Sequence, residues 1–223
     1  MNNKLRKLGN YVGLLDQIVN VQVKDVEHVI VAGGFLRDLF LEQQPKDIDI
    51  FFSGGKSSRS IVLKLQEQIP MFEGCEVEFF SDKDYGADEE NPEGTFNVYD
   101  VSKLTLKNGL RVDVVASAHV WDDPYELLAK NFDCNINAIA YTKNGLITPN
   151  GKPMRGRVYY PLGGAYTDSP VTAERMEKLI NKDLRGDWTS FKQFFAEKDW
   201  ERMMQMRMEL LEELKKKEAE RAF

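Results

Sequence analysis

The fold is decided by one stretch near the N-terminus, Val29-Ile30-Val31-Ala32-Gly33-Gly34-Phe35-Leu36-Arg37-Asp38, and by Lys46-Asp47-Ile48-Asp49-Ile50 behind it. The first run is a short apolar segment that ends in two glycines and continues with helix-forming residues. This order predicts a strand, a glycine turn and the start of a helix. Glycines let an anion approach the main chain without a Cβ in the way, and amides at a helix N-terminus favour negative charge. The turn is therefore a candidate phosphate site.

Asp47 and Asp49 carry the chemistry of the second run. Successive side chains of a strand point to opposite faces, so the two carboxylates project together while Ile48 and Ile50 project the other way. Two like charges side by side repel each other unless a cation bridges them or solvent screens them. A divalent metal with oxygen ligands is the commonest useful solution, so the pair is a candidate metal site.

Strands and helices alternate through the first half of the chain. The patterns predict helices near residues 4–20, 35–42, 57–69 and 122–130, and strands near 28–32, 47–52, 76–80, 96–106 and 110–115. Lys107-Asn108-Gly109 separates the last two strands and favours a hairpin, because Asn-Gly accepts the positive φ angles of tight turns. The acidic stretch 81–94 is expected to be an exposed loop. From Val171 onward the chain looks mainly helical, with the Trp and Phe residues of 188–200 in its core.

This order predicts an α+β or α/β fold: a mixed sheet flanked by helices, with a short helical part at the end. We divide the chain into residues 1–165 and a helical extension, 166–223. The leucines of the charged C-terminal run could also join two copies of the chain. Such contacts between the C-terminal helices would make the protein a homo-oligomer.

Asp113 is the candidate for a third carboxylate, in the strand Leu110-Arg111-Val112-Asp113-Val114-Val115. Three carboxylates on one face could hold two Mg²⁺ ions, which bridge nucleotide phosphates and lower the pKa of an attacking hydroxyl. Phosphoryl and nucleotidyl transfer need positioning and charge neutralisation more than covalent help, so the near absence of His does not count against them. The competing interpretation places Asp113 on the surface of an edge strand.

Composition sets the remaining bounds. With 223 residues, 42% of them hydrophobic, the chain can bury a substantial core. No run reaches the roughly 18 apolar residues of a membrane span, and no apolar signal region follows Met1, so we expect a cytoplasmic protein.

Cys75 and Cys134 lack metal-ligand spacing and are expected to be reduced thiols. A net charge of -6 weakens any non-specific binding of nucleic acid. The basic group Lys178, Lys182 and Arg185 is interpreted as solvated surface.

The motifs together resemble the nucleotidyltransferase superfamily of DNA polymerase β. They are most similar to the head of the class II tRNA CCA-adding enzymes and bacterial poly(A) polymerases. The resemblance spans about residues 28–165 and rests on the two runs above and on Phe132-Asp133-Cys134-Asn135-Ile136-Asn137-Ala138-Ile139-Ala140. The last segment is similar to the family's Arg-Arg-Asp-Phe-Thr-Ile-Asn-Ala. The resemblance implies the nucleotidyltransferase fold.

The resemblance also implies a reaction: transfer of a nucleoside monophosphate from an NTP to an acceptor hydroxyl, with pyrophosphate leaving. Asp47 and Asp49 would bind the two Mg²⁺ ions, with Asp113 as the third carboxylate. The triphosphate would be held by Gly33, Gly34, Arg37 and Asp38, and the nucleotide pocket would be shaped by Asp133 and Asn137. The acceptor implied is the 3′ end of a tRNA-like RNA.

Two departures from the family leave alternatives open. Asn131 and Phe132 stand where the family has two arginines, and the stretch after Pro170 is too short for the helical regions that grip tRNA. The chain could instead be an inactive module that binds nucleotide or a protein partner. It could also transfer nucleotides to a protein or a small molecule. Arg37 could simply pair with Asp38 on a helix surface, and Asn137 could satisfy backbone groups in a buried turn.

Overall fold

A computed structural model describes residues 9–81, 98–117, 121–149, 156–162 and 173–220. Within these residues, seven strands form one mixed sheet in the order β3-β4-β5-β2-β1-β6-β7. The strands are β1 (Val29–Ala32), β2 (Asp47–Phe52), β3 (Val77–Ser81), β4 (Val98–Thr105), β5 (Arg111–Ser117), β6 (Ala140–Thr142) and β7 (Gly145–Ile147). All the neighbouring pairs are antiparallel except β2 and β5, which run parallel. The prediction of a mixed sheet flanked by helices is confirmed.

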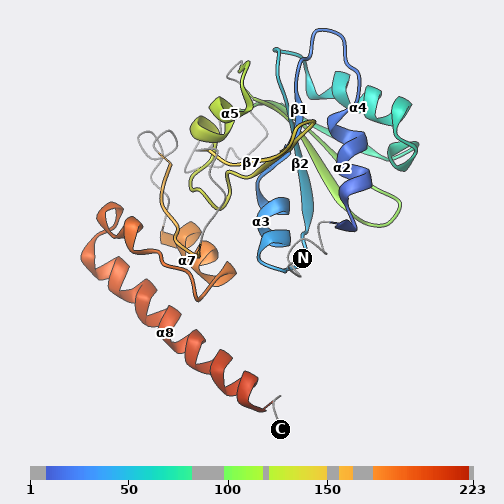
Figure 1. Ribbon diagram of the computed structural model, residues 1–223. Coiled ribbons are helices and arrows are strands. Elements are labelled where there is room, and N and C mark those ends of the chain that lie inside the picture. The colour runs from blue at the N-terminus through green and yellow to red at the C-terminus, as the bar shows by residue number, and fades with distance from the viewer. Residues whose placement is uncertain (1–8, 82–97, 118–120, 150–155, 163–172, 221–223) are drawn as a thin grey trace.

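Helices cover the two faces of the sheet (Figure 1). One face packs against α2 (Val12–Val19), α3 (Gly34–Phe40), α4 (Ser58–Gln68) and the 3₁₀ segment η1 (Pro70–Phe72). The β1 end of the other face packs against α5 (Pro124–Asn131). None of the described helices is both long and apolar enough to cross a membrane.

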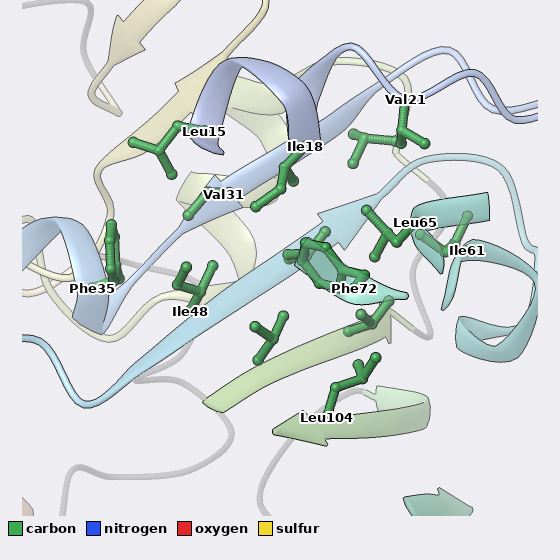
Figure 2. Packing of buried hydrophobic residues seen from close by; sticks show 14 of the residues in the cluster. Leu15, Ile18, Val21, Val31, Phe35, Ile48, Ile61, Leu65, Phe72 and Leu104 are labelled. Atoms are coloured by element: carbon green, nitrogen blue, oxygen red, sulfur yellow. The ribbon is translucent and has the colours of Figure 1, made fainter. Parts of the chain in front are cut away.

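Strand β2 shows how the sequence pattern positions the site. Its burial alternates along the strand, with Ile48 and Ile50 fully buried and Asp47 and Asp49 half-buried. Figure 2 shows Ile48 among the buried side chains of the main core, near Phe35 and Val31. Burial of such a side chain contributes about 1.5–3 kcal/mol. The apolar face therefore anchors the strand, which fixes the direction of its two carboxylates.

A second core joins the C-terminal helices to the sheet domain. It contains side chains from α7 (Ala173–Lys182), the 3₁₀ segment η2 (Thr189–Phe194) and α8 (Glu197–Glu220). Trp188, Phe191 and Trp200 are buried in it, as their spacing predicts, but the same prediction is wrong for Phe194, which is 41% exposed. Cys134 and Tyr159 pack into the same cluster, so residues on both sides of position 165 share one core. The division at residue 165 stays a prediction.

Most predicted elements lie within a few residues of the observed ones. The hairpin of β4 and β5 turns at Gly109, whose φ is +81°. The first predicted helix begins outside the described residues and is observed as α2. The predicted loop at 81–94 falls outside the described residues apart from Ser81, which ends β3. Strand β5 lies between β4 and β2, so Asp113 is on an interior strand and not on an edge.

Candidate functional site

The turn between β1 and α3 requires glycine at position 33. Gly33 has φ +89° and ψ −139°, a conformation essentially restricted to glycine. A Cβ on Gly33 would lie 3.2 Å from Asp49 Oδ2 and 3.2 Å from Phe132 Cε1. The Gly33 amide donates a hydrogen bond to the Ile139 carbonyl at 3.1 Å. The turn therefore brings bare main chain directly against one of the candidate carboxylates.

The parallel pairing of β2 with β5 brings the three predicted carboxylates to one place. Asp49 is the register partner of Asp113, and Asp47 is the partner of Arg111. Register partners project from the same face of a sheet, and residues two apart on a strand do so too. The face is the one opposite the core side chains of Ile48 and its neighbours. Asp47, Asp49 and Asp113 therefore project from the same face of the sheet, although Asp113 lies far from the other two in the sequence.

The electrostatics of Asp49 show that the three charges act on one another. The pKa of Asp49 is raised to about 7, first by burial of the carboxylate and then by the negative charges of Asp47 and Asp113. The Arg37 guanidinium and the Gly34 amide oppose this rise. Without a cation, therefore, the protein disfavours the ionised form of Asp49.

Asp113 is perturbed in the same direction. Burial is the largest cause that raises its pKa, and Asp47 adds to the rise. Lys103, its register partner on β4, and Arg111 lower the pKa. Asp113 is therefore a carboxylate set between an acidic and a basic neighbour on the exposed side of the sheet.

Asp47 lies at the open edge of this group. Its Oδ2 atom is 3.5 Å from Nη2 of Arg111, and both side chains are more than one-third exposed. Among the described residues, no group of three His, Cys, Asp or Glu side chains is arranged to hold a metal ion. The oxygen donors are nevertheless those that Mg²⁺ prefers.

A hollow of about 540 Å³ opens beside Asp47 and Asp113. Ligand pockets in proteins commonly have volumes of this order. The remaining lining residues come from the β3–β5 side: Glu76, Glu78, Lys103, Leu104, Thr105 and Arg111. The hollow therefore offers a polar space of mixed charge next to two of the candidate carboxylates.

The four predicted nucleotide-binding side chains beyond the turn form one hydrogen-bonded network. Arg37 donates from Nε to Asp38 Oδ1 and from Nη1 to Asn137 Oδ1, each at 2.8 Å. Asn137 donates from Nδ2 to Asp133 Oδ1 at 2.6 Å. Asp38, Asp133 and Asn137 are all buried. The pairing of Arg37 with Asp38 is thus real, but it belongs to a buried network and not to an exposed helix surface.

Two cations of this network were not predicted from the sequence. Lys182 donates to Asp38 Oδ2 at 2.9 Å, and Arg175 donates to Asp133 Oδ2 at 2.6 Å. The interpretation of Lys182 as solvated surface was wrong, because its side chain is 29% exposed and paired with a buried carboxylate. Their spacing of seven residues places both cations on one face of α7. That spacing is a signal in the sequence, but it does not reveal which carboxylates the cations meet.

The two positions that depart from the family pattern have structural roles here. Phe132 is 9% exposed and packs edge-on against Phe51, with ring centroids 5.6 Å apart. Asn131 donates a hydrogen bond from Nδ2 to the Leu127 carbonyl at 3.3 Å, at the end of α5. The space next to Gly33 is therefore filled by an apolar ring at the position where the family carries an arginine.

The fold is a nucleotidyltransferase-like fold, similar to that of the head of CCA-adding enzymes. A Thermotoga maritima CCA-adding enzyme complexed with tRNA is 22% identical with a TM-score of 0.52, covering 91% of this chain and 42% of that one. A CCA-adding enzyme in complex with CTP is 22% identical with a TM-score of 0.54, covering 92% and 45%. A CCA-adding enzyme in an apo form is 22% identical with a TM-score of 0.51, and the match covers 95% of this chain and 50% of that one. The chain thus spans half of these enzymes or less.

The sequence identifies the family more narrowly. The model of the Gabija anti-defense 2 (Gad2) family matches residues 3–150, so the chain belongs to the Gad2 family. None of the curated proteins matched the chain.

Proposed function

We propose that this chain is a Mg²⁺-dependent nucleotidyltransferase that transfers a nucleoside monophosphate from an NTP to an acceptor hydroxyl and releases pyrophosphate. The observation that carries the proposal is the register of Asp49 with Asp113, with the Gly33 turn packed against Asp49. The raised pKa of Asp49 supports it, because a cation at this point would relieve a repulsion that the fold has built in.

Each residue has a defined part in this reaction. Asp47 and Asp49 would hold the metal ions, and Asp113 would accept a hydrogen bond from the attacking hydroxyl. Bound Mg²⁺ would supply charge neutralisation for the phosphates and a lower pKa for that hydroxyl. Arg37 would contact the triphosphate as a cationic donor. Gly33 would let the phosphates approach the main chain without steric hindrance.

The acceptor is the second part of the proposal. By resemblance the acceptor is the 3′ end of an RNA, and the family description connects the chain with counteracting a defence named Gabija. A protein or a small molecule is the alternative acceptor. The mixed charge of the hollow beside Asp113 does not favour a polyanion over these alternatives. We therefore propose that the nucleotidyl transfer counteracts Gabija, and that the acceptor is identified by the molecule that becomes labelled.

The reaction is tested with each of the four labelled NTPs, with and without Mg²⁺, in the presence of total RNA or of a lysate from cells that carry Gabija. Label on RNA supports an RNA acceptor, and label on protein alone overturns that assignment. Asp47→Ala and Asp49→Ala are expected to abolish transfer while the fold stays intact. Asp122→Ala, at an exposed position outside the site, is the matched control. Full activity in either site variant would reject the metal assignment.

A second candidate function is a nucleotide-binding or partner-binding module without transfer. The observation that favours it is Phe132, which packs where the family has an arginine. Calorimetric titration with NTPs and Mg²⁺ is decisive at the first step, since an absence of metal-dependent NTP binding would exclude the enzyme. Suppression of Gabija by the Asp49→Ala variant to the wild-type level would favour the binding module, whereas its loss would favour catalysis.

A further inference from the structure

Helix α7 contacts the candidate nucleotide site through two buried carboxylates, those of Asp38 and Asp133. In each of them, one oxygen accepts a hydrogen bond from a residue of the site and the other accepts one from α7. Asp38 accepts from Arg37 with Oδ1 and from Lys182 with Oδ2. Asp133 accepts from Asn137 with Oδ1 and from Arg175 with Oδ2. One oxygen of each therefore faces the site and the other faces α7.

We propose that Arg175 and Lys182 are positioning residues that set the orientation of Arg37. This inference rests on the proposed function, since it assigns Arg37 to the triphosphate. Neither cation needs to touch the nucleotide. They act through the carboxylates and through Asn137, which accepts a hydrogen bond from Arg37 Nη1.

The geometry of Arg37 shows what is being positioned. Its Nε and Nη1 atoms are occupied by Asp38 and Asn137. Its Nη2 atom hydrogen-bonds to none of the residues that the structure describes, and it lies 3.4 Å from where a Cβ on Gly34 would be. Arg37 also lowers the pKa of Asp49, which places its charge within reach of the carboxylate centre. The donor left over thus lies at the glycine turn, where the proposed function puts the phosphates.

Lys182 is needed for this orientation because guanidinium and carboxylate groups prefer to pair through two parallel hydrogen bonds. Lys182 holds Oδ2 of Asp38 on the α7 side and so keeps the carboxylate turned with Oδ1 toward Arg37. Without Lys182, Arg37 can take both oxygens and swing its free nitrogen away from Gly34. Arg175 acts in the same way on Asp133, because it holds Oδ2 and so keeps Oδ1 directed at Asn137.

The charged groups of the network are closely paired. Arg37 and Lys182 pair with Asp38 and Arg175 pairs with Asp133, while the charge of Arg37 also acts on Asp49. The carboxylates are almost fully buried, and burial strengthens such interactions because solvent screens them less. The network therefore holds the charge of Arg37 at the glycine turn.

The test compares Lys182→Met and Arg175→Met with the wild type by calorimetric titration with each NTP and Mg²⁺, and with the parent nucleoside by competition. The triphosphate is expected to bind about tenfold to a hundredfold more weakly to both variants. The nucleoside is expected to bind unchanged, because it has no phosphate for Arg37 to contact. Lys182→Arg keeps the contact with Asp38 and is expected to retain tight binding.

Lys178→Met is the matched control, because Lys178 lies on the same helix and pairs with Glu174 at an exposed position. Thermal melts of each variant establish that binding is measured on folded protein. Wild-type triphosphate affinity in Lys182→Met and Arg175→Met would overturn the inference. An equal loss for triphosphate and nucleoside would overturn it too, since that result indicates a general loss of structure.

The same titration separates this inference from the proposed function. A wild-type chain that binds NTP without transferring it overturns the transfer reaction alone and leaves the positioning of Arg37 supported by the variants. A wild-type chain that binds no NTP overturns both.

Discussion

The built-in repulsion at Asp49 predicts that Asp49→Asn makes the metal-free protein more stable at alkaline pH. The pKa of Asp49 is about 7 in the folded protein and 3.8 in the unfolded chain. The rise comes mainly from burial of the carboxylate and also from the charges of Asp47 and Asp113. Between these two values the folded protein keeps the proton that the unfolded chain has lost. The free energy of unfolding therefore falls as the pH rises through this window and levels off above pH 7.

The magnitude follows from the two pKa values. Each pH unit inside the window costs about 1.4 kcal/mol, so the wild type loses about 3 kcal/mol between pH 5 and pH 8 through this one group. Asparagine has nearly the same shape as the protonated carboxyl but does not ionise. The variant should therefore lack this loss, so that its advantage over the wild type grows by about 3 kcal/mol between pH 5 and pH 8, as an upper limit.

Urea unfolding in the presence of a chelator at pH 5 and at pH 8 measures this difference. The difference between the free energies of unfolding of the two proteins removes the contribution of other groups that titrate in the same range. Asp122→Asn serves as an exposed control. Saturating Mg²⁺ at pH 8 should stabilise the wild type and not the variant, because ligands that bind only the folded state raise its stability. Equal pH dependence in wild type and Asp49→Asn would refute the reasoning.

Three further predictions follow from local geometry. Gly33→Ala should cost about 1–3 kcal/mol of stability and weaken NTP binding, since it strains a positive φ and crowds Asp49; urea unfolding and calorimetry measure both. Phe132→Arg should cost about 1–3 kcal/mol, because it replaces a buried ring that packs on Phe51; a variant as stable as the wild type would contradict this packing role. Tyr141→Phe should cost about 1 kcal/mol at neutral pH, by losing the 2.5 Å bond to Asp16.

The hydrogen bond of Tyr141 also has a defined pH dependence. The neutral hydroxyl donates to Asp16, and this bond is the main cause that raises the pKa of Tyr141 to about 12. The stabilisation is therefore complete below the ordinary pKa of 10 and is lost as the pH rises toward 12. A spectrophotometric titration of the tyrosines should show a step near pH 12 that disappears in Tyr141→Phe, while Tyr159, whose pKa burial and Asp183 raise further, still ionises later in both proteins.

Much of the fold could be predicted because the signals are local. The alternation in β2 places Asp47 and Asp49 on one face, and burial of Ile48 and Ile50 confirms it. The Asn108-Gly109 turn predicts the hairpin of β4 and β5. Both signals depend on residues next to each other in the chain, where the period of a strand or the φ of a turn determines geometry.

The composition of the candidate site was harder to predict, because it depends on contacts between distant parts of the chain. The sequence by itself determined the glycine turn, the carboxylate pair and the likeness to nucleotidyltransferases. Only the tertiary structure decided that Asp113 sits in register with Asp49, and that Lys182 reaches Asp38 across 144 positions of the chain. Strand order and helix docking are settled by burial of the whole core, which no local period of the sequence encodes.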